Sequence, residues 1–381
     1  MADKTGQNGL HIVRVRQGGR KQVHITAQAT AGDCPRTVAQ AVAAALRDEE
    51  ARVVSLKVFG SPRVADAAAG AVREGIGGGE WPVTAVGGAG FPDGAACQMQ
   101  VHAISGTAVE AVRLGDRSVG VAFEDDAARY CVLGDLRSRD PARSRPEQAH
   151  EVLDTMEAGL AAAGMDFTHV VRTWFYLDDI LSWYGPFNDV RTGFFAERRV
   201  LDGVVPASTG IGMVRRASWP LAGRMPTPPS TALVADLLAM QPKRAEVRIC
   251  SVASPLQCCA REYGSSFSRA VEVSLAGVRR LYVSGTASID AAGQTLYAGD
   301  VRRQVAETMA VVRAILESRG MGWSDVVSGV AYFARAADAP VLGAYLREQG
   351  LPALPLALTR GEICREGLLF ELEVEAWRAG S

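Results

Sequence analysis

The chain has 381 residues, of which 48% are hydrophobic and 22% are charged, and its formal net charge is −1 at pH 7. This composition is that of an ordinary globular protein, and the balanced charge argues against a nucleic-acid or anionic-membrane partner. No stretch of about 18 apolar residues could span a bilayer, and the N-terminal segment lacks the apolar core of a signal peptide. The seven cysteines form no CxxC pair, so neither a disulfide framework nor a zinc site is predicted. We therefore expect a reduced, cytoplasmic protein.

Taken in chain order, the predicted elements repeat three times. Three stretches share a run of β-branched and aromatic residues that follows an amphipathic helix pattern: ARVVSLKVFG (51–60), THVVRTWFYL (168–177) and SDVVSGVAYF (324–333). The second and third helix patterns match most closely. In both, a Gln precedes the first Val of the Val-Val pair by 22 residues, and Gly-Met stands at the same place. The first helix pattern is shorter and more degenerate.

A strand pattern precedes each of these helices, and a second helix pattern and a closing strand follow. Each unit is therefore predicted to have the order β-β-α-β-α-β, with its helices on one face of a mixed sheet. We place the three units at 10–105, 106–241 and 242–381. The Pro-rich stretch WPLAGRMPTPPS (219–230) is typical of a long loop. The Gly clusters at 75–79 and 87–90 are also interpreted as loops, since they lack the Lys-Ser/Thr that a phosphate-binding loop needs.

The third unit has no histidine, since all five histidines lie before residue 170. Proton transfer within this unit must therefore use a carboxylate, Tyr, Cys, Lys or water. The sequence contains no G-x-S-x-G, P-loop, G-x-G-x-x-G or H-E-x-x-H pattern, which argues against a nucleophile elbow, a nucleotide loop or a metalloprotease site. We expect neither a metal nor an organic cofactor.

Three acids alternate with apolar residues in FELEVEA (370–376), which is the period of a strand. The face that carries Glu371, Glu373 and Glu375 is either solvated or places one acid for chemistry. We expect Glu373 and Glu375 to belong to a solvated face. An apolar site with Glu373 nearby would raise the pKa of Glu371 and keep it protonated near neutral pH.

The spacing of the units singles out one of these acids. Glu371 follows Val326 by 45 residues, and in the first unit Gln98 follows Val53 by 45 residues. The corresponding strand of the second unit has Asp236 as its only acid, in a register that the sequence leaves open. Only the third unit therefore offers a carboxylate at this position.

Several stretches resemble known families. The third unit is similar to the RidA/YjgF superfamily, which folds as trimers, in YGSSFSRAV (263–271), LYVSGTASID (281–290) and FELEVEA. Across roughly 106–378 the chain more closely resembles the chorismatases, which are chorismate-hydrolysing members of that superfamily. This resemblance rests on VVRTWFYL (170–177), VPASTGIG (205–212), YGSSFSRA and EICREGLLFELE (362–373). The first hundred residues match the chorismatases poorly, and only a RidA-like topology is expected there.

The resemblance implies an α+β fold of three RidA/YjgF-like (chorismate mutase-like) units, packed as a pseudo-trimer within one chain. It also implies a cofactor-independent enzyme that cleaves the enolpyruvyl ether of chorismate. The products would be pyruvate and either a dihydroxycyclohexadiene carboxylate or a hydroxybenzoate. The first Glu of the last strand, Glu371, would be the catalytic acid. Further self-association of the chain cannot be read from the sequence.

Chorismate carries two carboxylates, so arginines are expected to face the site. Arg172, Arg269 and Arg335 are candidates, each with a surface or interface ion pair as the alternative. Tyr263 and Gly264 open the YGSSFSRA stretch, where they would either contact a polar ligand or form a structural turn.

One further site candidate is a thiol, and two positions differ from the sequence pattern of single-unit RidA enzymes. Cys364 precedes Glu371 by seven residues and either lines the pocket or is a buried structural thiol. Single-unit RidA enzymes bind an imino-acid carboxylate through the Arg of a Pro-Ala-Arg stretch. Here Ser208 and Leu354 stand at that place, which argues against imine deamination. A RidA-like deaminase and a non-catalytic RidA-like binding or scaffold protein remain the alternatives.

Overall fold

The computed structural model describes residues 2–7, 9–17, 19–29, 33–87, 97–213, 231–275 and 277–380. The predicted Pro-rich loop at 219–230 and the cluster GGAG after Gly87 lie outside the described residues. Within these ranges the strands form three six-stranded sheets, each with two helices.

The elements follow the same order three times. The first sheet and its helices are β1 (Ala2–Gln7), β2 (Leu10–Gln17), β3 (Arg20–Gln28), α1 (Pro35–Asp48), β4 (Arg52–Phe59), α2 (Pro62–Ile76), β5 (Val83–Val86) and β6 (Gln98–Ser105). The second are β7 (Val109–Leu114), β8 (Arg117–Glu124), β9 (Ala128–Leu136), α3 (Arg145–Ala162), β10 (Val170–Asp178), α4 (Tyr184–Glu197), β11 (Ala207–Met213) and β12 (Leu233–Pro242). The third are β13 (Arg248–Val252), β14 (Ala270–Leu275), β15 (Val278–Ala287), α5 (Val301–Ser318), β16 (Val326–Phe333), α6 (Pro340–Glu348), β17 (Leu356–Arg360) and β18 (Phe370–Ala379).

Each unit has two strands more than the predicted order β-β-α-β-α-β. One is the first strand at the sheet edge, and the other is the short strand after the second helix, which pairs in parallel with its neighbour. The edge strand β13 buries a single residue, so its hydrophobic alternation is weak. The strand β5 has only four residues, which is too short for a clear period. We keep the predicted unit boundaries as a proposal.

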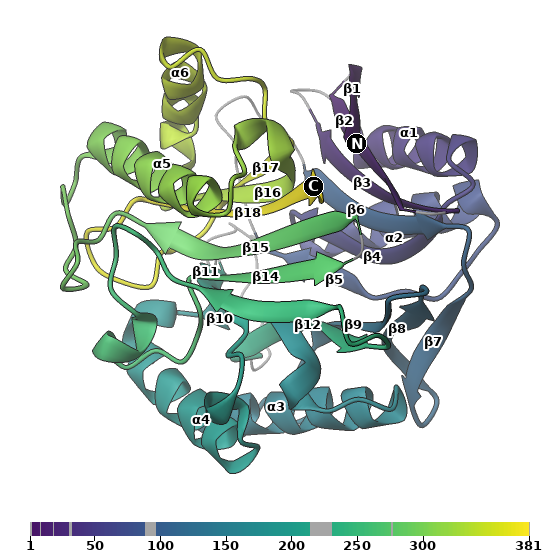
Figure 1. The fold of residues 1–381 in the computed structure, drawn as a ribbon, viewed down its shortest axis with the longest axis horizontal. Coiled ribbons are helices and arrows are strands. Elements are labelled where there is room, and N and C mark those ends of the chain that lie inside the picture. The colour runs from purple at the N-terminus through teal and green to yellow at the C-terminus, as the bar shows by residue number, and fades with distance from the viewer. Residues whose placement is uncertain are drawn as a thin grey trace, which may run out of the picture.

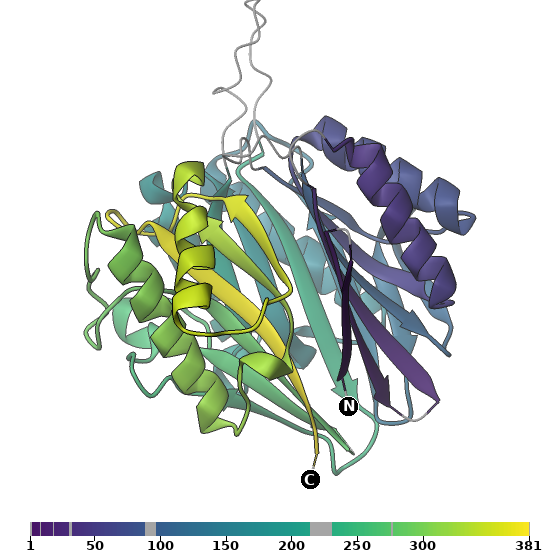
Figure 2. The ribbon, with the colours of Figure 1, turned by 90° about the horizontal axis from the view of Figure 1, so that it is seen from above.

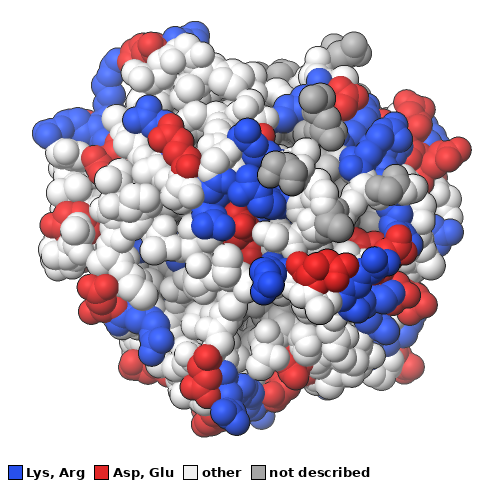
Figure 3. Space-filling model, viewed as in Figure 1, with Lys and Arg blue, Asp and Glu red and all other residues white. Residues whose placement is uncertain are grey.

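The three units close into a ring within one chain, which confirms the predicted pseudo-trimer. In Figure 1 the helices lie at three outer corners and the strands lie in the middle. The parallel strand of each unit contacts the next unit: β5 contacts β9, β11 contacts β15, and β17 contacts β3 and β6. Figure 2 shows both termini at the same edge of the molecule. Figure 3 shows basic and acidic side chains in mixed groups over one face, in keeping with the net charge of −1.

Local sequence signals explain why the helices begin where they do. Ser144 accepts a hydrogen bond from the backbone N–H of Glu147 at 3.4 Å, and the Glu147 carboxylate accepts one from the Ser144 N–H at 2.9 Å. This capping box starts α3 and satisfies two otherwise unpaired donors. Val152, Met156 and Leu160, at intervals of four residues, are buried on one face of α3. That face packs on the second sheet, against β9 and β12.

Candidate functional site

A pocket lies at the border between the second and third units. Tyr184, Ser208 and Gly210 line it from the second unit. The third unit contributes the other wall: Tyr263, Phe267, Arg269, Gly285, Ala287, Ile289, Cys364, Arg365, Leu368 and Glu371. The contact between β11 and β15 forms this border, so the pocket is incomplete in either unit alone.

Glu371 is the buried acid of this pocket. It lies on β18 between Ala287 of β15 and Tyr332 of β16, and it is 3% exposed. Its Oε1 atom lies against Gly285, where an added Cβ would be 2.0 Å from that oxygen. Burial, and secondly the charge of Glu373, raise the pKa of Glu371 to about 8. A carboxyl with this pKa is mostly protonated at neutral pH and can donate a proton.

Glu373 and Glu375 do not form a solvated face, so that prediction was wrong. Glu373 is 6% exposed and accepts hydrogen bonds from Arg172 Nη2 at 2.6 Å and from Trp174 Nε1 at 3.0 Å. Glu375 is partly buried and accepts from Trp377 Nε1 at 2.5 Å. Burial raises the pKa of Glu375. The strand period identifies the face that these acids share, but the side chains that cover it come from other units.

Arg269 places a buried cation in the same pocket. Its side chain lies 5.3 Å from the ring centroid of Tyr263 and 5.5 Å from that of Phe267, and the residue is 5% exposed. Nε donates to the backbone carbonyl of Cys258 at 2.9 Å. Nη2 has no hydrogen-bond partner among the described residues. A buried guanidinium with an unused donor favours a carboxylate ligand.

Tyr263, Gly264 and Cys364 have different places. Tyr263 ends the short 3-10 helix Ala260–Tyr263 and lines the pocket. Gly264 follows it with φ of 83°, a left-handed conformation that glycine adopts without strain, and is not in the pocket wall. Cys364 lines the pocket, and burial raises its pKa to about 12, so the group is a thiol at neutral pH.

The other two predicted arginines lie outside the pocket. Arg172 bonds Thr209 and Glu373, both at 2.6 Å, and lines a separate cavity in the centre of the molecule. Arg335 follows β16, is exposed, and pairs with Asp338 Oδ2 at 2.7 Å. The structure therefore brings together Glu371, Tyr263, Arg269 and Cys364, and leaves Arg172, Arg335 and Gly264 out of the pocket wall.

Sequence reasoning missed three polar residues of the pocket. Arg365 lies with its guanidinium 4.4 Å from the ring centroid of Tyr263. Arg365 and Ser208 stand in EICREGLLFELE and VPASTGIG, two of the stretches that carry the chorismatase resemblance, so a signal was present. Tyr184 begins α4, and its ring packs over Gly210, where an added Cβ would lie 3.2 Å from the ring. No local signal marks Tyr184.

The registers of the three sheets show why this pocket has no acidic counterpart. The pairs equivalent to Tyr332–Glu371 are Phe59–Gln98 and Tyr176–Val234. Two residues along the strands, the pairs equivalent to Val330–Glu373 are Lys57–Gln100 and Trp174–Asp236. Asp236 therefore corresponds to Glu373, which resolves the register left open above. Gln98 and Val234 occupy the position of Glu371 in the first and second units.

At two of the unit borders, a threonine hydroxyl donates a hydrogen bond to a buried carboxylate. Thr209 Oγ1 donates to Glu373 Oε2 and accepts from the Gly285 N–H at 3.0 Å, between the second and third units. Thr84 Oγ1 donates to Asp236 Oδ1 at 2.7 Å, between the first and second units. The Gly285 N–H that donates to Thr209 lies on the backbone against which the Glu371 carboxyl packs. The equivalent N–H at Thr84 is that of Asp135, at 3.1 Å, and Val234 stands there at the position of Glu371.

The described residues contain no group of three His, Cys, Asp or Glu side chains that could hold a metal ion. None of their helices is both long and apolar enough to cross a membrane.

The fold and the pocket define a protein of three units of like topology in one chain, with one buried acid, Glu371, in the described wall of a pocket at a unit border. A solved chorismatase has the same three-unit fold: it is 19% identical, with a TM-score of 0.62, and the match covers 93% of this chain and 98% of that one. At this identity the likeness establishes the fold, and the resemblance stated from the sequence is confirmed at that level.

Single-unit proteins match one third of the chain. Residues 263–374 match the family model described as Endoribonuclease L-PSP. The YjgF gene product of E. coli is 18% identical, covers 34% of this chain and 98% of its own, and has a TM-score of 0.27. Yeast Mmf1 is 17% identical with the same coverages and a TM-score of 0.28. No curated protein matches the sequence.

Proposed function

We propose that this protein hydrolyses chorismate at its enolpyruvyl ether, with Glu371 as the general acid. The observation that carries this proposal is a buried carboxyl with a pKa of about 8 in a pocket that also contains a buried arginine. A solved chorismatase has the same three-unit fold, which supports the substrate.

The chemistry begins at carbon. Glu371 transfers its proton to the terminal methylene carbon of the enol ether, which leaves an oxocarbenium ion on the adjacent carbon. Water adds to this ion, and Glu371 recovers a proton from that water. The resulting hemiketal then breaks its ether bond to give pyruvate and a dihydroxycyclohexadiene carboxylate. If the ring instead loses the proton of the carbon that carries its hydroxyl before water adds, the ring–oxygen bond of the ether breaks, the oxygen leaves as the carbonyl of pyruvate, and the ring becomes a hydroxybenzoate.

Two arginines of the pocket would bind the carboxylates of the substrate. Arg269 offers the buried Nη2 donor, and Arg365 is partly exposed beside Tyr263. The enclosed space is about 40 Å³, smaller than chorismate. We therefore expect the wall formed by Tyr263 and Arg365 to move outward when the substrate binds.

The experiment is a product analysis of purified protein incubated with chorismate. Pyruvate is measured with a lactate dehydrogenase coupled assay, and the ring product is identified by chromatography. Stoichiometric pyruvate and one ring product are the expected result. No pyruvate release from chorismate would overturn the proposal, and ammonia release from an imino acid would point to the RidA-like deaminase. The position of Ser208 and Leu354, where a RidA deaminase has arginine, weighs against that second activity.

A further inference from the structure

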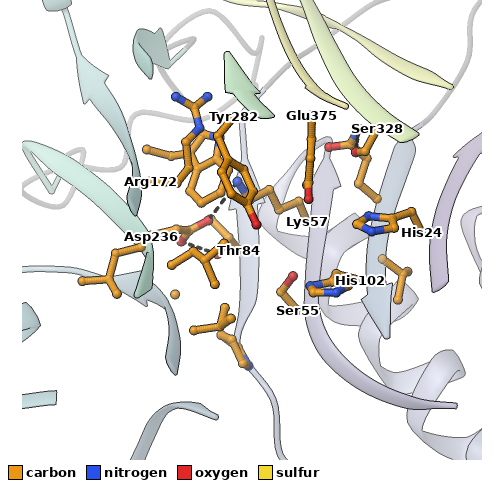
Figure 4. Close-up of a pocket in the computed structure, with 18 of the residues that line it drawn as sticks. His24, Ser55, Lys57, Thr84, His102, Arg172, Asp236, Tyr282, Ser328 and Glu375 are labelled. Carbon is orange, nitrogen blue, oxygen red and sulfur yellow. Dashed lines mark hydrogen bonds and ion pairs between the residues drawn. The ribbon is translucent and has the colours of Figure 1, made fainter. Parts of the chain in front are cut away.

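A second cavity lies at the centre of the ring, on the pseudo-threefold axis. It measures about 100 Å³ and is lined by strands of all three units. Figure 4 shows Arg172, Thr84 and Asp236 on one side of this space and His24 and His102 on the other. Glu371 is not part of its wall. We name it the axial cavity; it is separate from the candidate active site.

Three cations line the axial cavity, and two of them are paired. Arg172 bonds Glu373 at 2.6 Å, and Lys57 Nζ lies 3.5 Å from Asp236. The third, Arg280, makes no ion pair in the described part of the chain; its guanidinium lies 4.0 Å from the Trp377 ring centroid.

The remaining acid of the axial cavity does not pair with Arg280. Glu375 is the one other carboxyl in its described lining; its Oε1 accepts from Trp377 Nε1 at 2.5 Å, and among the described residues it makes no ion pair with Arg280. His24 and His102 add no charge, because burial lowers the pKa of each to about 3. Arg280 is therefore a buried cation without an ion-pair partner in the described part of the chain, and a buried cation without a counter-ion is costly.

Two donors of these cations are also unused. Arg172 and Arg280 are each 2% exposed, and neither Arg172 Nη1 nor Arg280 Nε has a hydrogen-bond partner among the described residues. Leaving such a buried donor unpaired costs about 1–3 kcal/mol, and more for a charged group. An acceptor with negative charge would satisfy these donors and pair with Arg280.

We propose that the axial cavity binds one small carboxylate anion, of the size of acetate or pyruvate. A single negative charge matches the single unpaired cation, whereas a phosphate dianion would exceed it. The space is larger than a halide ion needs. Phe123, Val101 and Leu238 give the cavity an apolar wall for the carbon end of the anion. This inference does not depend on the proposed reaction.

The test is calorimetric titration of the full chain with acetate after prolonged equilibration. We expect one acetate per chain. The variant Lys57→Met keeps a long side chain over Trp174, whose ring centroid lies 3.4 Å from Lys57 Nζ, but removes one cation. It should weaken acetate binding at least tenfold. Lys243→Met removes an exposed lysine that does not line the cavity and serves as the matched control, with unchanged binding.

Two further variants locate the anion. Ser55→Leu fills part of the axial cavity and should abolish binding even if Lys57→Met fails to fold. Arg269→Gln removes the buried donor of the candidate active site and should leave acetate binding unchanged. Absence of binding to the unaltered protein would overturn the proposal. So would binding that survives Ser55→Leu and is lost in Arg269→Gln, because the acetate would then occupy the Glu371 pocket.

Discussion

At the scale of the residue, the proton of Glu371 is the feature on which the proposed reaction depends. Glu371→Gln keeps the shape and hydrogen bonding of the side chain but removes the acid. General acid–base groups are typically worth about 10²–10⁴ in rate, so pyruvate release from chorismate should fall by at least about a hundredfold. Substrate binding should persist, because Arg269 and Arg365 are unchanged. Near-normal turnover in this variant would show that another group supplies the proton.

The neighbouring strand positions provide the comparison for that variant. Glu375→Gln changes an acid on the same strand that does not line the Glu371 pocket, so it should cost less than about tenfold in pyruvate release. Circular dichroism of both variants checks that their folds are unchanged.

The raised pKa of Glu371 also predicts the pH profile. The reaction needs the protonated carboxyl, so kcat/KM should fall as pH rises through about 8. Glu373→Gln removes the charge that helps to raise this pKa, and the alkaline limb should move to lower pH. An alkaline limb that stays in place in Glu373→Gln would exclude Glu373 as a cause of the raised pKa.

The same carboxyl links stability to pH. Its pKa is about 8 in the folded chain against 4.5 as the ordinary value. The folded state therefore binds more protons between these values. The contribution of the Glu371 carboxyl to the free energy of unfolding is complete below pH 4.5 and is lost as pH rises through 8. The loss is at most about 1.4 kcal/mol per pH unit. Chemical denaturation at several pH values should show a weaker alkaline loss in Glu371→Gln than in the unaltered protein.

At the scale of the element, the hydrogen bond from the Gly285 N–H to Thr209 Oγ1 joins β15 to β11, and the Glu371 carboxyl packs against Gly285. Thr209→Val removes the acceptor of the Gly285 N–H and a donor to Glu373. Each unpaired buried group costs about 1–3 kcal/mol, so stability should fall. Turnover should fall about tenfold as well, because the Glu371 carboxyl packs against Gly285 and would shift with that backbone. Thr84→Val breaks the equivalent bond beside Val234 and should lower stability while leaving turnover nearly unchanged. Equal loss of turnover in both variants would contradict a positioning role of Thr209.

The elements also show what the sequence could and could not predict. The helix and Val-Val repeats predicted three units, and the 45-residue spacing predicted that Glu371 is the acid without a counterpart. The edge strands and the burial of Glu373 were missed. The edge strand β13 buries a single residue and β5 has only four residues, so neither has a clear period. The burial of Glu373 depends on Arg172, Trp174 and Thr209 of the second unit, whereas hydrophobic periodicity reports only how one segment divides into two faces. Tyr184 was missed for the same reason, since its place in the pocket follows from the contact of β11 with β15.

At the scale of the whole molecule, the closed ring predicts that the three units unfold together. Gln98 Oε1 accepts from the Leu358 N–H at 2.5 Å across the border of the first and third units. Gln98→Ala should lower the free energy of unfolding by about 1–3 kcal/mol without creating an intermediate. Urea unfolding followed by tryptophan fluorescence and by far-UV circular dichroism should give coincident transitions. Separate transitions would show that the units are independent.

Because the three units belong to one chain, equivalent positions around the axis can carry different residues. In a ring of identical subunits they must carry the same residue. In a symmetric trimer every side chain on the axis occurs three times, so a lysine there would face two copies of itself. Here the equivalent positions are Lys57, Trp174 and Val330, and the lysine lies over the indole. A single substitution at the centre of this protein therefore changes one side chain instead of three. Its interior can combine a cation, an aromatic ring and an aliphatic group in one layer, which strict threefold symmetry forbids.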